Sequence, residues 1–197
     1  MRDEAWYVTR DDPDHDGGIR TAVNAWCEDP AAAKAKYGPI ASWDTSGITD
    51  MDALFYGRKD FNEDISRWNV SNVVDIRSIF EGAISFNCDL SRWDVRQVHS
   101  LSFVFAGAAS FNGDLSSWEV NQVESMTNTF KGAASFDGDL SRWEVGRCET
   151  MYGMFGKPPR SPASSAGRGP PARPPRPACS RTAPAPSRAG PNARTAP

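Results

Sequence analysis

The sequence predicts an α/β repeat solenoid, a short array of stacked coils with helices covering its N-terminal end. Three observations lead to this fold class. Tryptophan recurs every 25 residues, at Trp43, Trp68, Trp93, Trp118 and Trp143. Apolar positions around each tryptophan keep their polarity from one repeat to the next, as layers of a single core would. Each repeat also contains one strand-like and one helix-like apolar pattern.

Changes in composition divide the 197-residue chain into four segments. Residues 1–18 are polar and acid-rich, and residues 19–39 are predicted to form a helical N-terminal cap. Residues 40–156 hold about 4.5 units of the repeat. Residues 157–197 contain twelve of the fifteen prolines, eight Lys and Arg and no Asp or Glu, so we expect a disordered tail.

The cap is predicted from helical spacing and from its helix boundaries. Apolar side chains recur at i, i+3, i+4, i+7 and i+8 from Ile19. The first helix is expected to end near Asp29. Pro30 suits the first position of a second helix, which Gly38 would end.

In the second repeat, residues 65–70 form a short, β-prone segment, which predicts one strand. The next apolar residues, Ile76, Ile79, Phe80 and Ala83, have the spacing of two helical turns. A strand, a turn, a short helix and a glycine-containing return is the plan of a leucine-rich repeat, and 25 residues lies within its usual length. The predicted structural ladder consists of the five tryptophans and the aromatic layer of Phe80, Phe105 and Phe130.

A polar turn precedes each strand and reads FNxD, then Ile or Leu, then Ser. Short polar side chains close such turns by accepting hydrogen bonds from nearby backbone N–H groups. Stacked asparagines could also bond to the adjacent coil. The predicted turn-capping residues are Asn62, Asp64, Asn87, Asp89, Asn112, Asp114 and Asp139.

Two acidic columns raise the question of a metal. One follows tryptophan directly, and the other is the aspartate column that precedes it by four. Like charges on coils about 5 Å apart repel unless they are hydrogen-bonded, solvated or bridged by a cation. We predict no cofactor, with backbone capping and solvent exposure as the explanation and Ca²⁺ between coils as the alternative. The acid-rich run at 11–16 lacks the distal glutamate of a calcium loop and predicts a solvated turn.

The motifs W[DN]VSNV, F-x-GA-x-SFN and D[IL]S-x-W resemble the repeat of BspA-like leucine-rich-repeat surface proteins, in the variant abundant in mycoplasma lipoproteins and some unicellular algae. The resemblance covers about residues 40–155, and IRTAVNAWCED is similar to the lead-in segment of algal members. It implies a right-handed leucine-rich solenoid and, for bacterial members, surface display, adhesion or host-protein binding. It implies no catalytic residues. The chain departs from the family in having no signal peptide or lipobox cysteine, and its fifth repeat stops at Gly156.

Charge and hydropathy limit the partners. Residues 1–156 hold 14 basic and 25 acidic side chains, a net charge of −11 that disfavours nucleic acid. No stretch has the length of a membrane span. We expect a monomer. The sequence itself gives no location, and the family resemblance implies a cell-surface or secreted protein. Two alternatives to a disordered tail remain. Residues 171–174 form a PxxP motif that could bind PxxP-recognising modules. The tail could instead be a gene-model artefact that truncates the last repeat.

Catalytic or metal-binding constellations are not evident in the sequence. Histidine occurs only at His15 and His99, without a nucleophile at a recognisable spacing. The four cysteines lack metal-ligand spacing; Cys148 is expected to be buried and Cys88 exposed. We therefore predict no enzyme.

A recognition face should use columns that vary between repeats while their neighbours stay fixed. The preferred column is Arg67, Arg92, Ser117 and Arg142, just before tryptophan in the predicted strand. A second column is Arg77, Ser102, Thr127 and Tyr152, with Ser78, Phe103, Asn128 and Gly153 beside it. The predicted function is a non-enzymatic module that binds protein or glycan. The alternatives are a structural fragment of a longer array, a Ca²⁺-stabilised solenoid and, last, an enzyme on a repeat scaffold.

Overall fold

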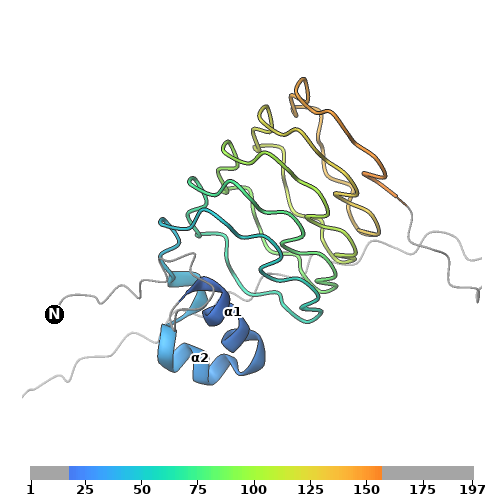
Figure 1. Cartoon of the computed structure of the whole chain (residues 1–197). Coiled ribbons are helices and arrows are strands. Elements are labelled where there is room, and N and C mark those ends of the chain that lie inside the picture. Colours follow the sequence, from blue (N-terminus) through green and yellow to red (C-terminus); the bar gives the residue numbers. More distant parts are fainter. Residues whose placement is uncertain (1–17, 157–197) are drawn as a thin grey trace, which may run out of the picture.

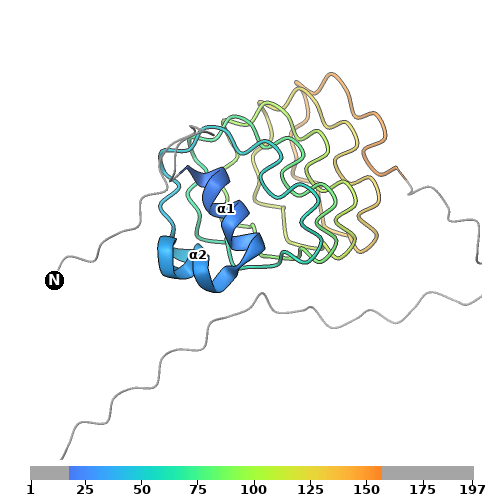
Figure 2. The same cartoon turned by 60° about the horizontal axis from the view of Figure 1, so that its bottom comes forward.

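A computed structural model describes residues 18–156 of the chain. The predicted polar N-terminal segment, His15, Cys179 and the Pro/Arg-rich tail lie outside the described residues. The described part begins with two α-helices, α1 (Ile19–Glu28) and α2 (Pro30–Tyr37), and one 3-10 turn, η1 (Ile40–Ser42). The 25-residue coils then follow one another in a row, with α1 and α2 at the first end (Figures 1 and 2).

The two helices form where the sequence predicts them. Ile19, Ala22, Val23 and Trp26 are the buried residues of α1. Asp29 caps α2 by accepting hydrogen bonds from the backbone N–H groups of Ala31 and Ala32, both at 3.0 Å. Gly38, at φ 71°, ends α2. Edge-to-face contact between the indoles of Trp26 and Trp43, 5.9 Å apart, joins the helices to the first coil.

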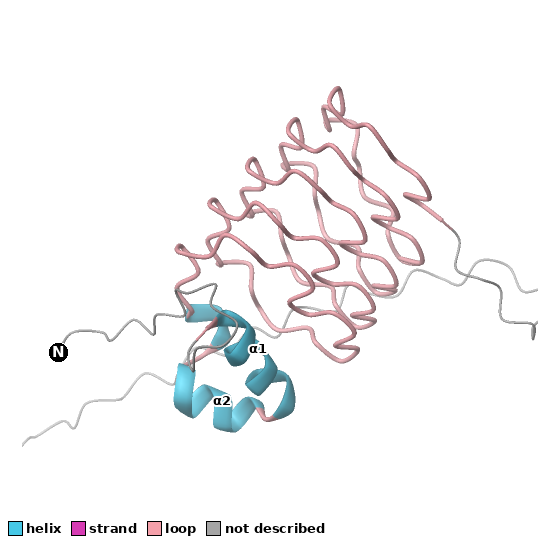
Figure 3. Cartoon of the chain, viewed as in Figure 1, coloured by secondary structure: helices cyan, strands magenta, loops and turns pink. Residues whose placement is uncertain are grey.

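The predicted α/β solenoid is wrong. Within residues 18–156 the repeats contain no strand and no α-helix, and apart from η1 and a few isolated bridges their chain is turn or irregular backbone (Figure 3). In place of a sheet, neighbouring coils share isolated parallel bridges, such as Asp50 to Asp75 and Ser100 to Ser125. The leucine-rich-repeat plan of one strand and one short helix therefore does not describe this protein.

Consecutive β-turns explain why the apolar spacing within a repeat wrongly predicted a helix. In the second coil, backbone N–H groups donate to carbonyls three residues earlier, from Trp68 to Ile65, from Ile79 to Ile76 and from Ala83 to Phe80. A chain of such turns places residues i and i+3 on the core side, as a helix does. Apolar spacing alone cannot separate the two structures.

Phenylalanines form two parallel columns in the core. Phe55, Phe80, Phe105 and Phe130 stack along the row with ring centroids 5.5–5.8 Å apart. Each also stacks on the phenylalanine six residues later, as Phe80 does on Phe86 at 3.8 Å. Cys88 lies in the same core and is fully buried, so its predicted exposure is wrong, and Cys148 in the last coil is only half-buried.

The tryptophans connect one coil to the preceding one. All five are buried, with exposed fractions between 2% and 8%. The Nε1 groups of Trp68, Trp93, Trp118 and Trp143 donate to the carbonyls of residues 28 positions earlier, at 2.9–3.2 Å. Trp43, in the first coil, donates instead to the carbonyl of Gly38 at 3.2 Å. Each indole therefore packs the core, and the last four also satisfy a backbone carbonyl of the preceding coil.

Backbone hydrogen bonds between coils run mostly in one direction. In the first, third and fourth coils, the N–H groups at positions 8, 10, 12 and 14 after tryptophan donate to carbonyls of the next coil, and in the second coil those at positions 10, 12 and 14 do so. Leu101, Phe103, Phe105 and Gly107, for example, donate to Ser125, Thr127, Thr129 and Lys131 at 2.7–2.9 Å. We call these the forward columns. Two single columns beside them run in reverse, as from Glu124 N–H to the His99 carbonyl and from Ser110 N–H to the Ile84 carbonyl.

Each complete coil has two residues in the left-handed region of φ. The position 14 residues after tryptophan is glycine in the first four coils, with φ between 68° and 77°. The position 10 residues after tryptophan holds Ala53, Ser78, Phe103 and Asn128, with φ between 52° and 60°. Left-handed conformation costs a residue with a side chain about 1–2 kcal/mol. The glycine column avoids this cost, and the other column does not.

Gly57 and Ala53 offer a matched test of that difference. A Cβ at Gly57 would have nothing within 4 Å, so Gly57→Ala measures the backbone cost without steric clash. We expect Gly57→Ala to lower the free energy of unfolding by about 1–2 kcal/mol and Ala53→Gly to change it by less than about 1 kcal/mol. Urea denaturation of the full chain measures both. Equal losses for the two variants would contradict the assigned conformations.

Candidate functional site

Acidic and amide side chains of the repeats cap turns of their own coil. The Oδ1 atoms of Asp64, Asp89, Asp114 and Asp139 accept from the N–H two residues later, at 2.9–3.1 Å. Asp44, Asn69 and Asp94, which follow tryptophan directly, do the same at 2.9–3.2 Å. These hydrogen bonds lower the pKa of Asp139 and of Asp44, through bonds from Ser141 and Ser46 respectively. The aspartate column before tryptophan and the first three members of the column after it thus have a structural role.

Asparagines of the FNxD turn bond between coils. Asn62 Oδ1 accepts from the backbone N–H of Asn87, and Asn87 Oδ1 from that of Asn112, each at 2.8 Å. Asn112 Oδ1 accepts in turn from Asp137 N–H at 3.1 Å. This ladder runs opposite to the forward columns.

A shallow groove of about 580 Å³ crosses the first four coils. It lies over the positions 7, 9 and 10 residues after tryptophan, beside the exposed position 6. We call it the polar groove, and its lining residues are Asp52, Val74, Asp75, Arg77, Ser78, His99, Ser100, Ser102, Phe103, Glu124 and Ser125.

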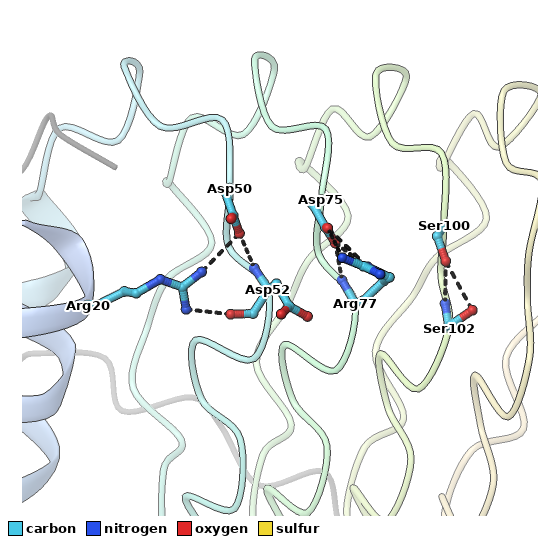
Figure 4. Close-up of polar contacts among 7 residues, drawn as sticks. All are labelled: Arg20, Asp50, Asp52, Asp75, Arg77, Ser100 and Ser102. Atoms are coloured by element: carbon cyan, nitrogen blue, oxygen red, sulfur yellow. Dashed lines mark hydrogen bonds and ion pairs between the residues drawn. The ribbon is translucent and has the colours of Figure 1, made fainter. Parts of the chain in front are cut away.

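Polar side chains follow one another along this groove, coil by coil (Figure 4). At its first end, Arg20 of α1 donates through Nη2 to Asp50 Oδ1 at 2.9 Å and through Nη1 to the Asp52 carbonyl at 2.5 Å. In the next coil, Asp75 and Arg77 form an ion pair at 2.6 Å. Among the described residues no side-chain hydrogen bond joins these two clusters, but their charges form one network, because Arg20 acts on Asp75 and Arg77 acts on Asp52.

Hydroxyls replace the charges farther along the groove. Ser100 Oγ donates to Ser102 Oγ at 3.0 Å, and the hydroxyls of Ser102 and Ser125 lie 2.8 Å apart. Ser125 Oγ donates to Thr127 Oγ1 at 3.2 Å. The carboxylate or hydroxyl at position 7 also accepts from the N–H two residues later, as Asp75 does from Arg77 and Ser100 from Ser102. Both types of side chain can therefore close this turn, and their identity can vary.

Neighbouring carboxylates of the groove have pKa values shifted in opposite directions. Burial raises the pKa of Asp75, but hydrogen bonds from Arg77, together with the charges of Arg77 and Arg20, outweigh it and lower the pKa overall. Burial, followed by the charge of Asp75, raises the pKa of Asp52. Asp75 is thus stabilised as an anion, whereas Asp52 is not.

These shifts predict opposite effects of two amide substitutions. Because folding lowers the pKa of Asp75, its contribution to stability is present above the ordinary pKa of about 3.9 and is lost as pH falls through the folded-state value. The raised pKa of Asp52 has the opposite effect: its charged carboxylate destabilises the fold at neutral pH, and this destabilisation is lost as pH falls and the carboxylate becomes protonated. At pH 7 we expect Asp75→Asn to lower the free energy of unfolding and Asp52→Asn to raise it, each by less than about 1 kcal/mol. The melting temperature should shift in the same direction in each variant. Asparagine can still cap the turn at position 75.

Thermal unfolding monitored by circular dichroism between pH 7 and pH 3 measures both effects. The difference in melting temperature between each variant and the parent chain should shrink toward pH 3, as the carboxylates of the parent become protonated. Shifts of the same sign at pH 7 would contradict the assignment.

The recognition column preferred from sequence lies elsewhere on the coil. Arg67, Arg92, Ser117 and Arg142 are exposed, and they sit in turns rather than in a strand. Ser117 and Arg142 line a separate hollow of about 310 Å³ near Trp118. Of the second predicted column, the second and third coils contribute their members to the polar groove: Arg77, Ser78, Ser102 and Phe103 line it, whereas the members from the fourth and fifth coils do not. Sequence reasoning missed Asp52 and Asp75 there, although the alternation Asp-x-Asp, Asp-x-Arg and Ser-x-Ser at positions 7 and 9 was available as a signal.

The family of the chain follows from comparison with known proteins. The family described as "Mycoplasma protein of unknown function, DUF285" matches residues 29–137 and 89–160. The chain belongs to this family. No curated protein and no solved structure matches it.

The matched ranges start at Asp29 and include all the 25-residue coils described here. The resemblance noted from the motifs is thus shown at the level of a Mycoplasma repeat family. For this DUF285 chain, no helix in residues 18–156 is long and apolar enough to cross a membrane. The same described residues contain no group of three or more His, Cys, Asp or Glu side chains placed to hold a metal ion.

Proposed function

We propose that this DUF285 chain is a non-enzymatic binding module for protein or glycan and that the polar groove is its ligand surface. The groove lies on the described coils. Its side chains differ from coil to coil, whereas the backbone conformation beneath them repeats. Such a division suits recognition, because the scaffold is fixed by its own hydrogen bonds while the surface can vary.

The left-handed column beside the groove is the observation that carries this proposal. Glycine occupies the other left-handed position in the first four coils, whereas this one holds Ala53, Ser78, Phe103 and Asn128. Phenylalanine at φ 60° is the most costly of these, because bulky residues rarely adopt this conformation. Strained residues persist where the surrounding structure fixes them and are concentrated at ligand-binding positions. Side chains retained where glycine would fit better support a role for them at the surface.

Chemically, the groove combines a few polar groups with apolar surface, as ligand sites do. Asp75 and Arg77 supply charge, Ser100 and Ser102 supply hydroxyls, and Val74 is 45% exposed. The hydroxyls bond to one another rather than to His99, which also lines the groove. That arrangement favours binding over nucleophilic catalysis.

The resemblance to BspA-like surface proteins supports the same class of function. Bacterial members of that group suggest adhesion or host-protein binding, and we extend this expectation, with display at the cell surface, to the present chain. The resemblance leaves the choice between protein and glycan open, so the test must include both.

A labelled full-length chain applied to arrays of glycans and peptides tests the proposal. Ser78→Gly combined with Phe103→Gly removes two groove side chains while keeping a backbone that glycine adopts readily. We expect this pair to weaken binding of an array ligand by about tenfold, as loss of a central contact does. The matched control, Arg67→Gly with Arg92→Gly, should bind as the parent chain does. Loss of binding in the control alone would assign the ligand to the column before tryptophan instead.

A further inference from the structure

The two ends of the row of coils differ in their hydrogen-bonding groups. In the forward columns every N–H points toward the C-terminal end and every carbonyl toward the N-terminal end. The carbonyl end adjoins α1, where Arg20 donates to the Asp52 carbonyl (Figure 4). A cation at the carbonyl end of aligned peptide dipoles is stabilising, as at the C-terminus of a helix.

The last described coil presents the opposite end. Met151, Gly153 and Phe155 occupy the donor positions of the forward columns, and no further coil follows them in residues 18–156. The side chains around these N–H groups are apolar and exposed: Met151 is 42%, Tyr152 77% and Phe155 63% accessible. One face of the Phe155 ring stacks on Phe130 at 5.5 Å, in continuation of the core column. We call this surface the donor edge.

Only an edge that offers carbonyl oxygens fits the donor edge. A second copy related by a twofold axis would place donor groups opposite donor groups. A second copy in the same orientation would have to present its carbonyl end, which is the end joined to α1 and Arg20. A helix is also excluded as the hydrogen-bonding partner, because its carbonyls are bonded internally along its length.

We propose that the donor edge binds an extended segment of polypeptide that stacks as a further coil of the same repeat type. The four coil–coil interfaces show what such a segment provides: carbonyls at alternate residues and a phenylalanine to stack on the preceding one. The fourth coil does this when Thr127 and Thr129 accept from Phe103 and Phe105, both at 2.9 Å. Polypeptide addition to an open edge is a general mode of recognition in which backbone bonds supply affinity and side chains supply specificity.

The reverse column beside the donor edge would set the register of the added segment. Glu149 N–H donates to the Glu124 carbonyl, and Glu124 N–H to the His99 carbonyl, both at 2.8 Å. The carbonyl of Glu149 therefore stands where the next coil's N–H would donate. One acceptor beside a row of donors defines both the direction and the position of the incoming chain.

Amide hydrogen exchange of the full chain, followed residue by residue by NMR, tests this proposal. The probe is an unlabelled synthetic peptide of residues 115–139, the sequence of the fourth coil. Without peptide, we expect the amides of Met151, Gly153 and Phe155 to exchange much faster than those of Met126, Asn128 and Phe130. With peptide, exchange of the first three should slow by at least about tenfold, the change that 1.4 kcal/mol of added protection gives. A scrambled peptide of the same composition should leave them unchanged.

Two further comparisons separate edge stacking from adhesion to an apolar patch. A peptide N-methylated at Met126 and Phe130 keeps the carbonyls that face the edge and loses only outward N–H groups, so it should still bind. Phe155→Asp should weaken peptide binding about tenfold. The control Tyr56→Asp, at an exposed aromatic residue of the first coil, should not.

Three results would overturn the proposal. One is absence of any peptide-dependent protection at the three edge amides. Another is slow exchange at these amides before peptide is added, which would mean that the chain itself or a second copy already covers the edge. The third is protection confined to other coils.

Discussion

Replacing Trp93 by alanine is expected to lower the free energy of unfolding by about 3–5 kcal/mol. The indole is 3% exposed, lies 5.9 Å from the Phe80 ring and donates to the Ile65 carbonyl at 3.2 Å. Alanine would leave a cavity in the middle of the row and deprive a buried carbonyl of its donor. An unpaired buried group adds its own desolvation penalty to the loss of packing.

Urea denaturation of Trp93→Ala, Trp93→Phe and the neighbouring Arg92→Ala separates these contributions. Phenylalanine keeps most of the apolar surface but removes the hydrogen bond, so a loss of about 1–2 kcal/mol is expected. The exposed Arg92 should cost less than about 0.5 kcal/mol. If Trp93→Ala cost no more than Arg92→Ala, the tryptophan column would have to be an accessible aromatic strip rather than part of the core.

Phe105→Ala should also cost about 3–5 kcal/mol, whereas the same substitution at Phe155 should cost less than about 1 kcal/mol. Both residues belong to one column. Phe105 is fully buried and stacks on Phe80, Phe111 and Phe130 at 5.8, 3.9 and 5.5 Å. Phe155 is 63% exposed and stacks only on Phe130 among the described rings.

The comparison holds the residue type and its place in the repeat constant. It changes the number of neighbouring coils and removes the stacking partner within the coil, which is Phe111 for Phe105 and is replaced by serine six residues after Phe155. In a repeat array each unit is stabilised mainly by its neighbours, so the cost should follow the number of neighbours present. Calorimetric or urea-induced unfolding of both variants provides the measurement. Equal costs would show that Phe155 is covered in solution, which would also bear on the donor edge proposed above.

Capping side chains show how a correct local prediction can accompany a wrong fold class. The Asn and Asp residues of the FNxD turn were predicted from their chemistry, and Asp64 and Asn62 make bonds of the expected kind. The same chemistry operates at two further positions in the first three coils, for example at Asn69 and Asp75. Capped turns this close together leave no room for a strand at residues 65–70. Left-handed residues such as Ser78 and Gly82 likewise prevent a helix at residues 76–83.

The candidate site shows a similar division. The variable residues Arg77, Ser102 and Phe103 could be picked out as a column from the repeat alignment. Their gathering into a groove with Asp52 and Val74 could not, because it depends on how coils stack. Nor could sequence reasoning foresee that Arg20, thirty residues before Asp50, would join the same network.

The sequence by itself determined the 25-residue period, the identity of the buried tryptophan and phenylalanine columns and the two helices before the first coil. These follow from burial and helix capping, which depend on residue type and spacing. Only the tertiary structure decided that the coils consist of turns, that their backbone bonds point mainly one way and that the two ends differ. The reason is that these features depend on the sign of φ and on hydrogen bonds between residues 24 to 26 positions apart, as from Phe80 to Val104. An apolar pattern carries no information about either.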